Sequence, residues 1–217
     1  MWEKVTVSMF QQLYDILNGQ NFSHEVERQI KLLAVMDDRP ESYYEDLPLA
    51  DLKREVKRAD FLTIEDMPTA KAPEYVTVDG HKFKVMYEVR DIRAGQFIDV
   101  MSSAKDADEH ILNLDKTLAA ICLPVIDGKV GKYGSMPFME VADLMARLPI
   151  VQASSIADFF YRVWTAFLKA TPDCLAKKVK RGEKLTEQEA ITLAAAFHSG
   201  GDGLTALSRW QSLNASH

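Results

Sequence analysis

The sequence predicts an α+β fold that is mainly helical, with one β-hairpin at about residues 75–89 packed on a helical core. Two observations support this prediction. Most of the chain repeats apolar residues at steps of three and four, which is the period of an amphipathic helix. Only the stretch YVTVDGHKFKVMYEV, residues 75–89, alternates apolar and polar residues as a half-buried strand does, and it is interrupted at Asp79-Gly80.

The Asp79-Gly80 pair favours a two-residue turn, because both central positions of such a turn need a positive φ. That turn pairs Val78 with His81 and Val76 with Phe83, and so fixes the register of the hairpin. One face is then apolar and requires a core, and it holds Val76, Val78, Phe83, Val85, Tyr87 and Val89.

Three helices are predicted before the hairpin: Thr6 to about Leu17, Ser23 to Asp38, and one that starts at Pro48. Residues 64–73 contain two prolines and little periodicity, and they read as a connector. We therefore divide the chain into an N-terminal helical unit (1–63), a hairpin with a helical core (74–199), and a flexible joint with a short amphipathic helix (200–217). The same pattern also fits one integrated domain.

After the hairpin, helices are predicted at 94–103 and 106–123, the second ended by Pro124. Residues 125–136 contain an Asp-Gly pair and further glycines, so they form either a second small hairpin or a loop. A helix from Pro137 leads into the most apolar helix, 150–170, which we expect at the centre of the core. A short basic helix (172–181) and a helix with a capping box (186–198) complete this part of the chain.

The composition excludes some classes of protein. The formal net charge is −6 and the sequence pI is about 5.4, whereas general phosphate-backbone binders present a basic face. Polar residues interrupt the longest apolar stretch, Ile150 to Leu168, and the N-terminus lacks the features of a secretory signal. We therefore expect a cytoplasmic protein that binds neither membrane nor nucleic acid. Cys122 and Cys174 are expected to be buried free thiols.

The search for catalytic and metal-binding motifs finds no H-E-x-x-H, C-x-x-C or G-x-S-x-G pattern. The densest polar cluster consists of Asp106, Asp108, Glu109 and His110. It could hold a hard cation or supply acid-base groups, or it could be the first turn of a helix, where acidic residues are favoured. The basic run Lys177 to Lys184 suits an acidic partner or a solvated surface. We expect no catalytic residue, metal or cofactor, although a site assembled from distant residues would leave no motif.

The last segment carries an apolar stripe, Leu204, Leu207, Trp210 and Leu213, after a glycine-rich joint. A tethered amphipathic helix of this kind either folds back on its own core or lies in the groove of a partner.

Three segments together resemble a known family. They are the opening WEKVTVSMFQQ from Trp2 to Gln12, the D-L-P-L sequence from Asp46 to Leu49, and VRDIRAGQFID from Val89 to Asp99. In this layout the chain resembles the tail assembly chaperones of tailed bacteriophages and prophages, several families of which share a β-hairpin followed by (L/V)-R-x-x-(T/R)-A-G-(D/Q). It departs from the commoner variant at Arg93 and Gln96, where Thr and Asp often stand.

The resemblance implies a non-enzymatic protein of the host bacterial cytoplasm. It would bind the helical tape measure protein and keep it soluble until the tail-tube protein assembles around it. The residues expected to bind the partner are Phe97, Ile98, Met101, Leu204, Leu207, Trp210 and Leu213. The alternatives are a structural virion protein, such as a head-to-tail connector or a tail-completion subunit that forms a ring, and a small enzyme or regulator.

Overall fold

The computed structural model describes residues 1–18, 22–64, 67–88, 91–103, 107–160 and 162. In this part of the chain the predicted class is confirmed: the fold is α+β and mainly helical, with a four-stranded antiparallel sheet in the order β1-β2-β3-β4. The remaining predicted segments, including the helices at 172–181 and 186–198 and the C-terminal stripe, lie outside the described residues.

The N-terminal part is a series of helices. In chain order they are η1 (Trp2–Lys4), α1 (Val7–Asn18), α2 (Glu25–Asp37), α3 (Glu41–Glu45), α4 (Leu49–Val56), η2 (Lys57–Ala59) and α5 (Phe61–Ile64). The longer helices match the predicted periodicity, and α4 follows Pro48 as expected. The short elements η1, α3, η2 and α5 were not predicted, because a single helical turn has no measurable period.

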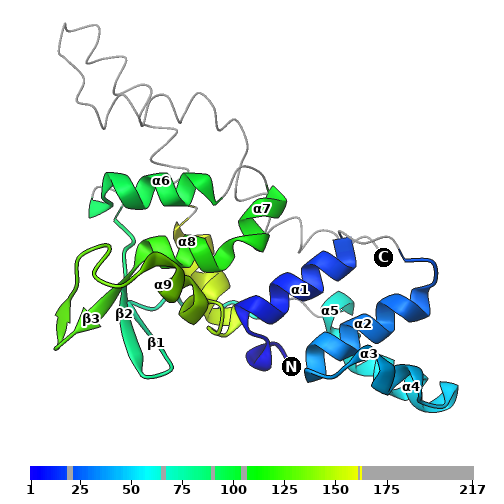
Figure 1. Ribbon diagram of the computed structural model, residues 1–217. Coiled ribbons are helices and arrows are strands. Elements are labelled where there is room, and N and C mark those ends of the chain that lie inside the picture. The colour runs from blue at the N-terminus through cyan, green and yellow to red at the C-terminus, as the bar shows by residue number, and fades with distance from the viewer. Residues whose placement is uncertain (19–21, 65–66, 89–90, 104–106, 161, 163–217) are drawn as a thin grey trace, which may run out of the picture.

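The second part contains the sheet. Its elements are β1 (Tyr75–Val78), β2 (His81–Val85), α6 (Ala94–Ser102), α7 (Ala107–Leu112), α8 (Leu114–Ile121), β3 (Cys122–Ile126), β4 (Lys129–Val130) and α9 (Phe138–Met145), followed by helical residues 150–160. The predicted register of the first hairpin is confirmed, with Val78 opposite His81 and Val76 opposite Phe83. In Figure 1 the sheet lies at one end and α2 to α5 at the other, with α1, α8 and α9 between them.

The prediction of one helix over 106–123 is wrong in two places. Asn113 leaves the helical conformation (φ −118°, ψ 27°) and separates α7 from α8. Its side-chain amide donates to the carbonyl of Glu109 at 3.1 Å, beside the bond from its own backbone N–H at 2.9 Å, and asparagine is a poor helix former. Cys122 and Leu123 belong to β3, because the residue before Pro124 is driven towards an extended conformation.

The alternative of a second hairpin is the one the structure adopts. β3 turns at Asp127 and Gly128, which both have positive φ, and pairs with β4. Pro124 accepts a hydrogen bond from the Gly131 N–H at 2.7 Å but has no N–H to return. The ladder between β3 and β4 therefore stops at Val130.

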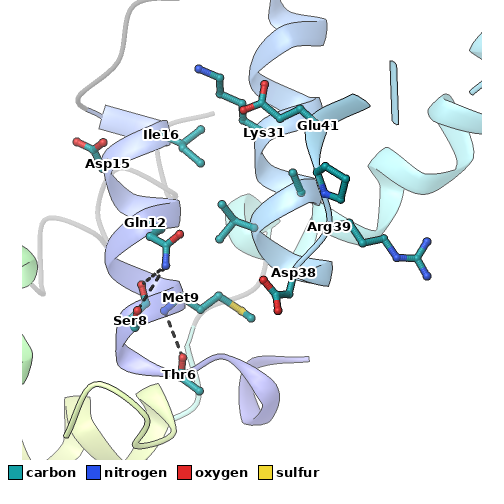
Figure 2. A pocket seen from close by; sticks show the side chains of 13 residues that line it. Thr6, Ser8, Met9, Gln12, Asp15, Ile16, Lys31, Asp38, Arg39 and Glu41 are labelled. Carbon is teal, nitrogen blue, oxygen red and sulfur yellow. Dashed lines mark hydrogen bonds between the residues drawn. The ribbon is translucent and has the colours of Figure 1, made fainter. Parts of the chain in front are cut away.

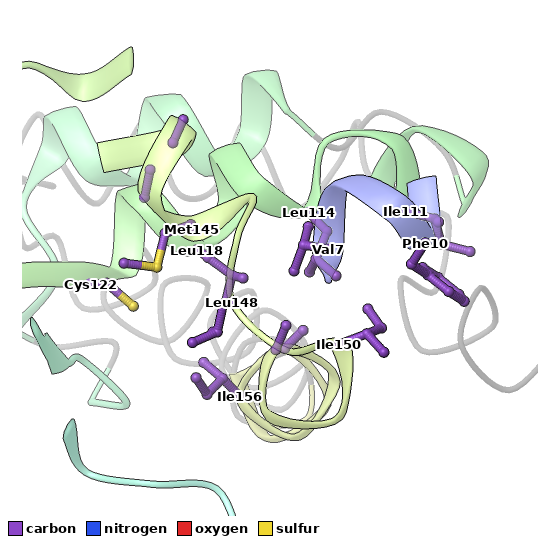
Figure 3. Close-up of a cluster of buried hydrophobic side chains, with 14 of the residues drawn as sticks. Val7, Phe10, Ile111, Leu114, Leu118, Cys122, Met145, Leu148, Ile150 and Ile156 are labelled. Carbon is purple, nitrogen blue, oxygen red and sulfur yellow. The ribbon is translucent and has the colours of Figure 1, made fainter. Parts of the chain in front are cut away.

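The main core lies between α1, α8, α9 and the helical residues 150–160, and Figure 3 shows side chains from these elements meeting there. The apolar face of the hairpin closes the same core, and Phe83 and Val85 are almost fully buried. Ile156 and Phe160 are buried, as expected for a central helix. Phe159 is 44% exposed, and its ring packs edge-on against Tyr87 at 4.7 Å between centroids.

Trp2 is a core residue that periodicity could not reveal. It precedes α1 in a short 3-10 turn, and its ring contacts those of Phe10 and Phe61 at 6.3 and 5.1 Å between centroids. The buried cluster that contains Trp2 also contains Val76 and Ile156, so residues from the predicted units 1–63 and 74–199 share one core. A second, smaller cluster joins α2, α3 and α4 and consists of Ile30, Leu33, Ala34, Tyr44 and Leu52.

Candidate functional site

A groove of about 690 Å³ runs between α1 and the C-terminal half of α2 (Figure 2). Its apolar lining comes from both helices: Met9 and Ile16 of α1 face Ala34 and Val35 of α2. Ile16 and Ala34 are buried, whereas Met9 and Val35 are half-buried. The groove therefore presents a narrow apolar strip between polar walls, which suits the apolar stripe of an amphipathic helix.

The end of α2 forms one rim of the groove. Asp38 adopts the left-handed conformation (φ 50°, ψ 50°), and its N–H bonds back to the last turn of the helix. The Arg39 N–H donates to the Ala34 carbonyl at 3.0 Å, so the chain reverses direction and leads through Pro40 into α3. This tight ending places Asp38 and Glu41 beside the groove, where both are exposed.

Charged side chains of both signs line the groove. Three carboxylates line it, those of Asp15, Asp38 and Glu41, against the two cations Lys31 and Arg39. Lys31 Nζ lies over the ring of Phe22 at 5.1 Å, and the Arg39 guanidinium lies over the ring of Tyr43 at 4.4 Å. In Figure 2 the Arg39 side chain points away from α1. The lining therefore carries one more carboxylate than cations, and the exposed Asp38 and Glu41 can face a lysine or arginine beside the apolar stripe of a ligand.

An ionic cluster behind the groove holds α2, α3 and α4 together. Both Arg58 terminal nitrogens reach the Asp37 carboxylate, at 2.5 and 2.8 Å, and Arg58 also bonds to Glu55 at 2.7 Å. The Tyr44 hydroxyl donates to the same Asp37 carboxylate. The hydrogen bond from Arg58 lowers the pKa of Asp37, whereas burial and the bond to Asp37 raise the pKa of Tyr44 to about 12. This cluster fixes the α2 wall of the groove.

The residues predicted to bind the partner differ in how far they are exposed to solvent. Phe97 is only 9% exposed and belongs to the core, whereas its neighbour Ile98 is 53% exposed. The side chain of Met101 and the stripe from Leu204 to Leu213 lie outside the described residues. Of the predicted set, Ile98 is therefore the one side chain that the described part of the chain offers to a partner.

Gln96, which lies in the stretch that carries the family resemblance, has a structural role in the fold. The Gln96 side chain is 1% exposed; its Nε2 donates to the Ala120 carbonyl at 2.7 Å, and its Oε1 accepts from the Arg93 N–H at 3.0 Å. Gln96 therefore caps the first turn of α6 and ties this helix to the end of α8.

A second, smaller cavity of about 170 Å³ lies where α9 meets β3. Apolar side chains surround it, together with the buried thiol of Cys122, whose pKa is raised by burial to about 12. The Tyr133 hydroxyl donates to Asp99 at its side, and burial raises the pKa of Tyr133. A thiol with so high a pKa is not a nucleophile at neutral pH, so Cys122 is a packing residue, as predicted.

The candidate cation or acid-base cluster at residues 106–110 lies only partly within the described residues. Asp106 and the side chain of Asp108 lie outside the described residues, and Glu109 and His110 are half-buried. In the described part of the chain, no cluster of His, Cys, Asp and Glu has the arrangement of a metal site. Every helix described there is too short or too polar to cross a bilayer.

Sequence reasoning missed the groove, because it forms only when α1 and α2 pack side by side. The available signal was weak: Met9 and Val35 are apolar residues at the edges of their helical stripes. Comparisons with protein-family models, curated proteins and solved structures found no match for this chain.

Proposed function

We propose that this protein is a non-enzymatic tail assembly chaperone of a tailed phage or prophage, which binds the helical tape measure protein and keeps it soluble in the host cytoplasm. Two features support the proposal. One is the resemblance carried by the stretch from Val89 to Asp99. The other is the groove between α1 and α2, which has an apolar strip and the exposed carboxylates of Asp38 and Glu41 beside it.

The groove is the observation that supports an amphipathic helix as the ligand. A helix with an apolar stripe can lie along Met9, Ile16 and Val35, while its flanking basic residues face Asp38 and Glu41. Such contacts at a solvent-exposed rim contribute roughly 0.2–1 kcal/mol per ion pair and weaken with salt. Weak rim contacts of this kind favour reversible binding, which a chaperone needs if tail-tube protein is to displace it.

The experiment is co-expression of the chain with the tape measure protein of the same tail module, followed by measurement of the soluble tape measure fraction. Gln12→Trp fills the groove from an exposed position on α1. Lys53→Trp, on the exposed surface of α4 and outside the groove lining, is the matched control. We expect Gln12→Trp to lower the soluble fraction and Lys53→Trp to leave it unchanged.

Two further variants test the rim and the second surface. Asp38→Asn removes the charge and keeps a residue that tolerates the left-handed conformation, so it should weaken binding without unfolding α2. Ile98→Ser tests the exposed residue of α6. If the wild-type chain does not solubilise the tape measure protein, the chaperone function is wrong. If it does so and the groove variants behave as wild type, only the assignment of the groove is wrong.

The structural alternative remains testable in the same preparations. A connector or tail-completion subunit would form a stable ring and would be present in purified particles, whereas a chaperone would be absent from them.

A further inference from the structure

Strand β1 forms an outer edge of the sheet, and the backbone N–H and C=O groups of successive residues point alternately towards β2 and away from it. The Val85 N–H donates to the Glu74 carbonyl at 3.0 Å. Val76 and Val78 lie two and four residues after Glu74 in the same ladder, so they face β2 in the same way. The backbone groups of these residues therefore point towards β2. Those of Tyr75 and Thr77 point away from β2, to the open side of the strand, and both residues are exposed.

Within its own residues, β1 carries none of three common devices that block pairing at an edge. Exposed edges are usually blocked by proline, by a bulge or by charges that project along the edge. Residues 75–78 contain none of these. The charges at the two ends are paired within the chain, because Glu74 binds Lys84 and Asp79 at the turn binds Arg147.

The aromatic residue of the strand is also engaged on the face of the sheet. Lys82 Nζ and Lys84 Nζ lie 4.4 and 4.8 Å from the centroid of the Tyr75 ring. These contacts are with β2, so they hold the ring over the neighbouring strand and away from the open edge. Figure 1 shows β1 as the outermost strand on its side of the sheet.

We propose that β1 pairs antiparallel with β1 of a second copy of this chain, about a twofold axis that passes through Val76. In this register Tyr75 faces Thr77 of the second copy, and Thr77 faces its Tyr75. The N–H and C=O of both residues then find partners in both copies. An axis through Thr77 would instead place Tyr75 opposite the turn residue Asp79, and its outward groups would stay unpaired.

The side chains are compatible with this register. Glu74 faces Val78 and Asp79 faces Pro73 of the second copy, so no like charges meet across the axis. Val76 meets its own counterpart on the buried face. The lysines of β2 are separated from those of the second copy by both β1 strands, about 14 Å, which exceeds the Debye length of about 8 Å at physiological salt. The edge is therefore self-complementary, which favours a second copy over an extended segment of another protein.

The test uses one proline. Thr77→Pro removes an outward N–H that makes no bond to β2, and proline is tolerated on an edge strand. Thr77→Val keeps the N–H and the branched side chain, and is the matched control. In sedimentation experiments on the full chain, we expect wild type and Thr77→Val to shift with concentration from 24.5 kDa towards twice that mass, and Thr77→Pro to stay monomeric.

A crosslinking experiment covers the case in which Thr77→Pro does not fold. In a chain that also carries Cys174→Ser, Val76→Cys places the two new thiols in a pair with Cα atoms about 4.5 Å apart, within disulfide range. Val78→Cys, on the same face of the same strand, lies more than about 13 Å from its counterpart. We expect only Val76→Cys to form a crosslinked dimer under mild oxidation.

Three results would overturn the proposal: a wild-type chain that is monomeric at every concentration, a dimer that persists in folded Thr77→Pro, or equal crosslinking of the two cysteine variants. A monomeric wild type whose tape measure binding is lost in Thr77→Pro would show that the edge receives a strand of another protein.

Discussion

Gln96 is the residue of the α6 junction whose removal should affect the fold most. Its amide joins two elements that are distant in sequence, the start of α6 and the end of α8. The carbonyl of the next residue, Ile121, accepts from the Met86 N–H at 2.8 Å, so the same end of α8 also holds the segment that leads out of the hairpin. The side chain is almost fully buried, which means that water cannot replace the lost bonds.

Gln96→Ala should lower the free energy of unfolding by about 2–4 kcal/mol. Loss of the cap on the Arg93 N–H costs about 1 kcal/mol. The Ala120 carbonyl is left buried without its partner, which costs about 1–3 kcal/mol. The sum is large against the stability of an ordinary domain, about 5–15 kcal/mol.

Gln96→Glu keeps one of the two hydrogen bonds and removes the other, so it tests their contributions separately. The carboxylate can accept from the Arg93 N–H but cannot donate to the Ala120 carbonyl, 2.7 Å from the present nitrogen. Burial and this repulsion should raise the pKa of Glu in the folded state above its unfolded value of about 4.3. A raised pKa contributes stability at low pH that is lost as the pH rises through the folded pKa. The variant should therefore be less destabilised at about pH 5 than at about pH 8.

The assay is urea unfolding of wild type and both variants at the two pH values. Gln12→Ala, at an exposed position on α1, is the control and should stay within about 0.5 kcal/mol of wild type. The reasoning is refuted if Gln96→Ala is as stable as the control, or if Gln96→Glu loses more stability relative to wild type at the lower pH.

Two further predictions concern the ionic cluster and the buried thiol. Because Arg58 lowers the pKa of Asp37, their pairing stabilises the fold above about pH 4, and this stabilisation is lost as the pH falls through the folded pKa of Asp37. Arg58→Met should lower the free energy of unfolding by about 1–2 kcal/mol at neutral pH. It should also weaken the decrease of that free energy with acid, measured by urea unfolding. An unchanged acid dependence would contradict this. The second prediction uses a chain that carries Cys174→Ser, so that Cys122 is its one thiol. At about pH 8, Cys122 should react with iodoacetamide at least about 1,000-fold more slowly in the folded chain than in urea. The reason is that burial raises the pKa of the thiol from 9.0 to about 12 and also blocks access of the reagent. Equal rates by mass spectrometry would show that the thiol is accessible.

The sequence was sufficient where structure is decided locally. The Asp79-Gly80 turn fixed the register of β1 and β2, because a two-residue loop leaves one pairing for each residue. The helical stripes of α1, α2 and α9 were readable for the same reason. The end of α8 was not: residues 114–123 have a helical period, and the competing signal was the single residue Pro124.

The groove could not be predicted, because periodicity tells which residues face inward but not which helix they meet. Met9 and Val35 lie at the margins of their stripes, and only the packing of α1 against α2 turns those margins into one surface. Phe97 illustrates the opposite case. The alternation of buried Phe97 and exposed Ile98 depends on how α6 sits on α8, which its short sequence does not specify.

Pro124 limits how far any assembly through the sheet could grow. A sheet with two long open edges can add copies without end and form fibres, whereas one with a single usable edge closes after one pairing. Because Pro124 cannot return the bond from Gly131, β4 stops after two residues and offers little to an incoming strand. Pairing through β1 would therefore yield a finite sheet of two copies, and a residue with an N–H at position 124 would lengthen the second edge and favour polymers.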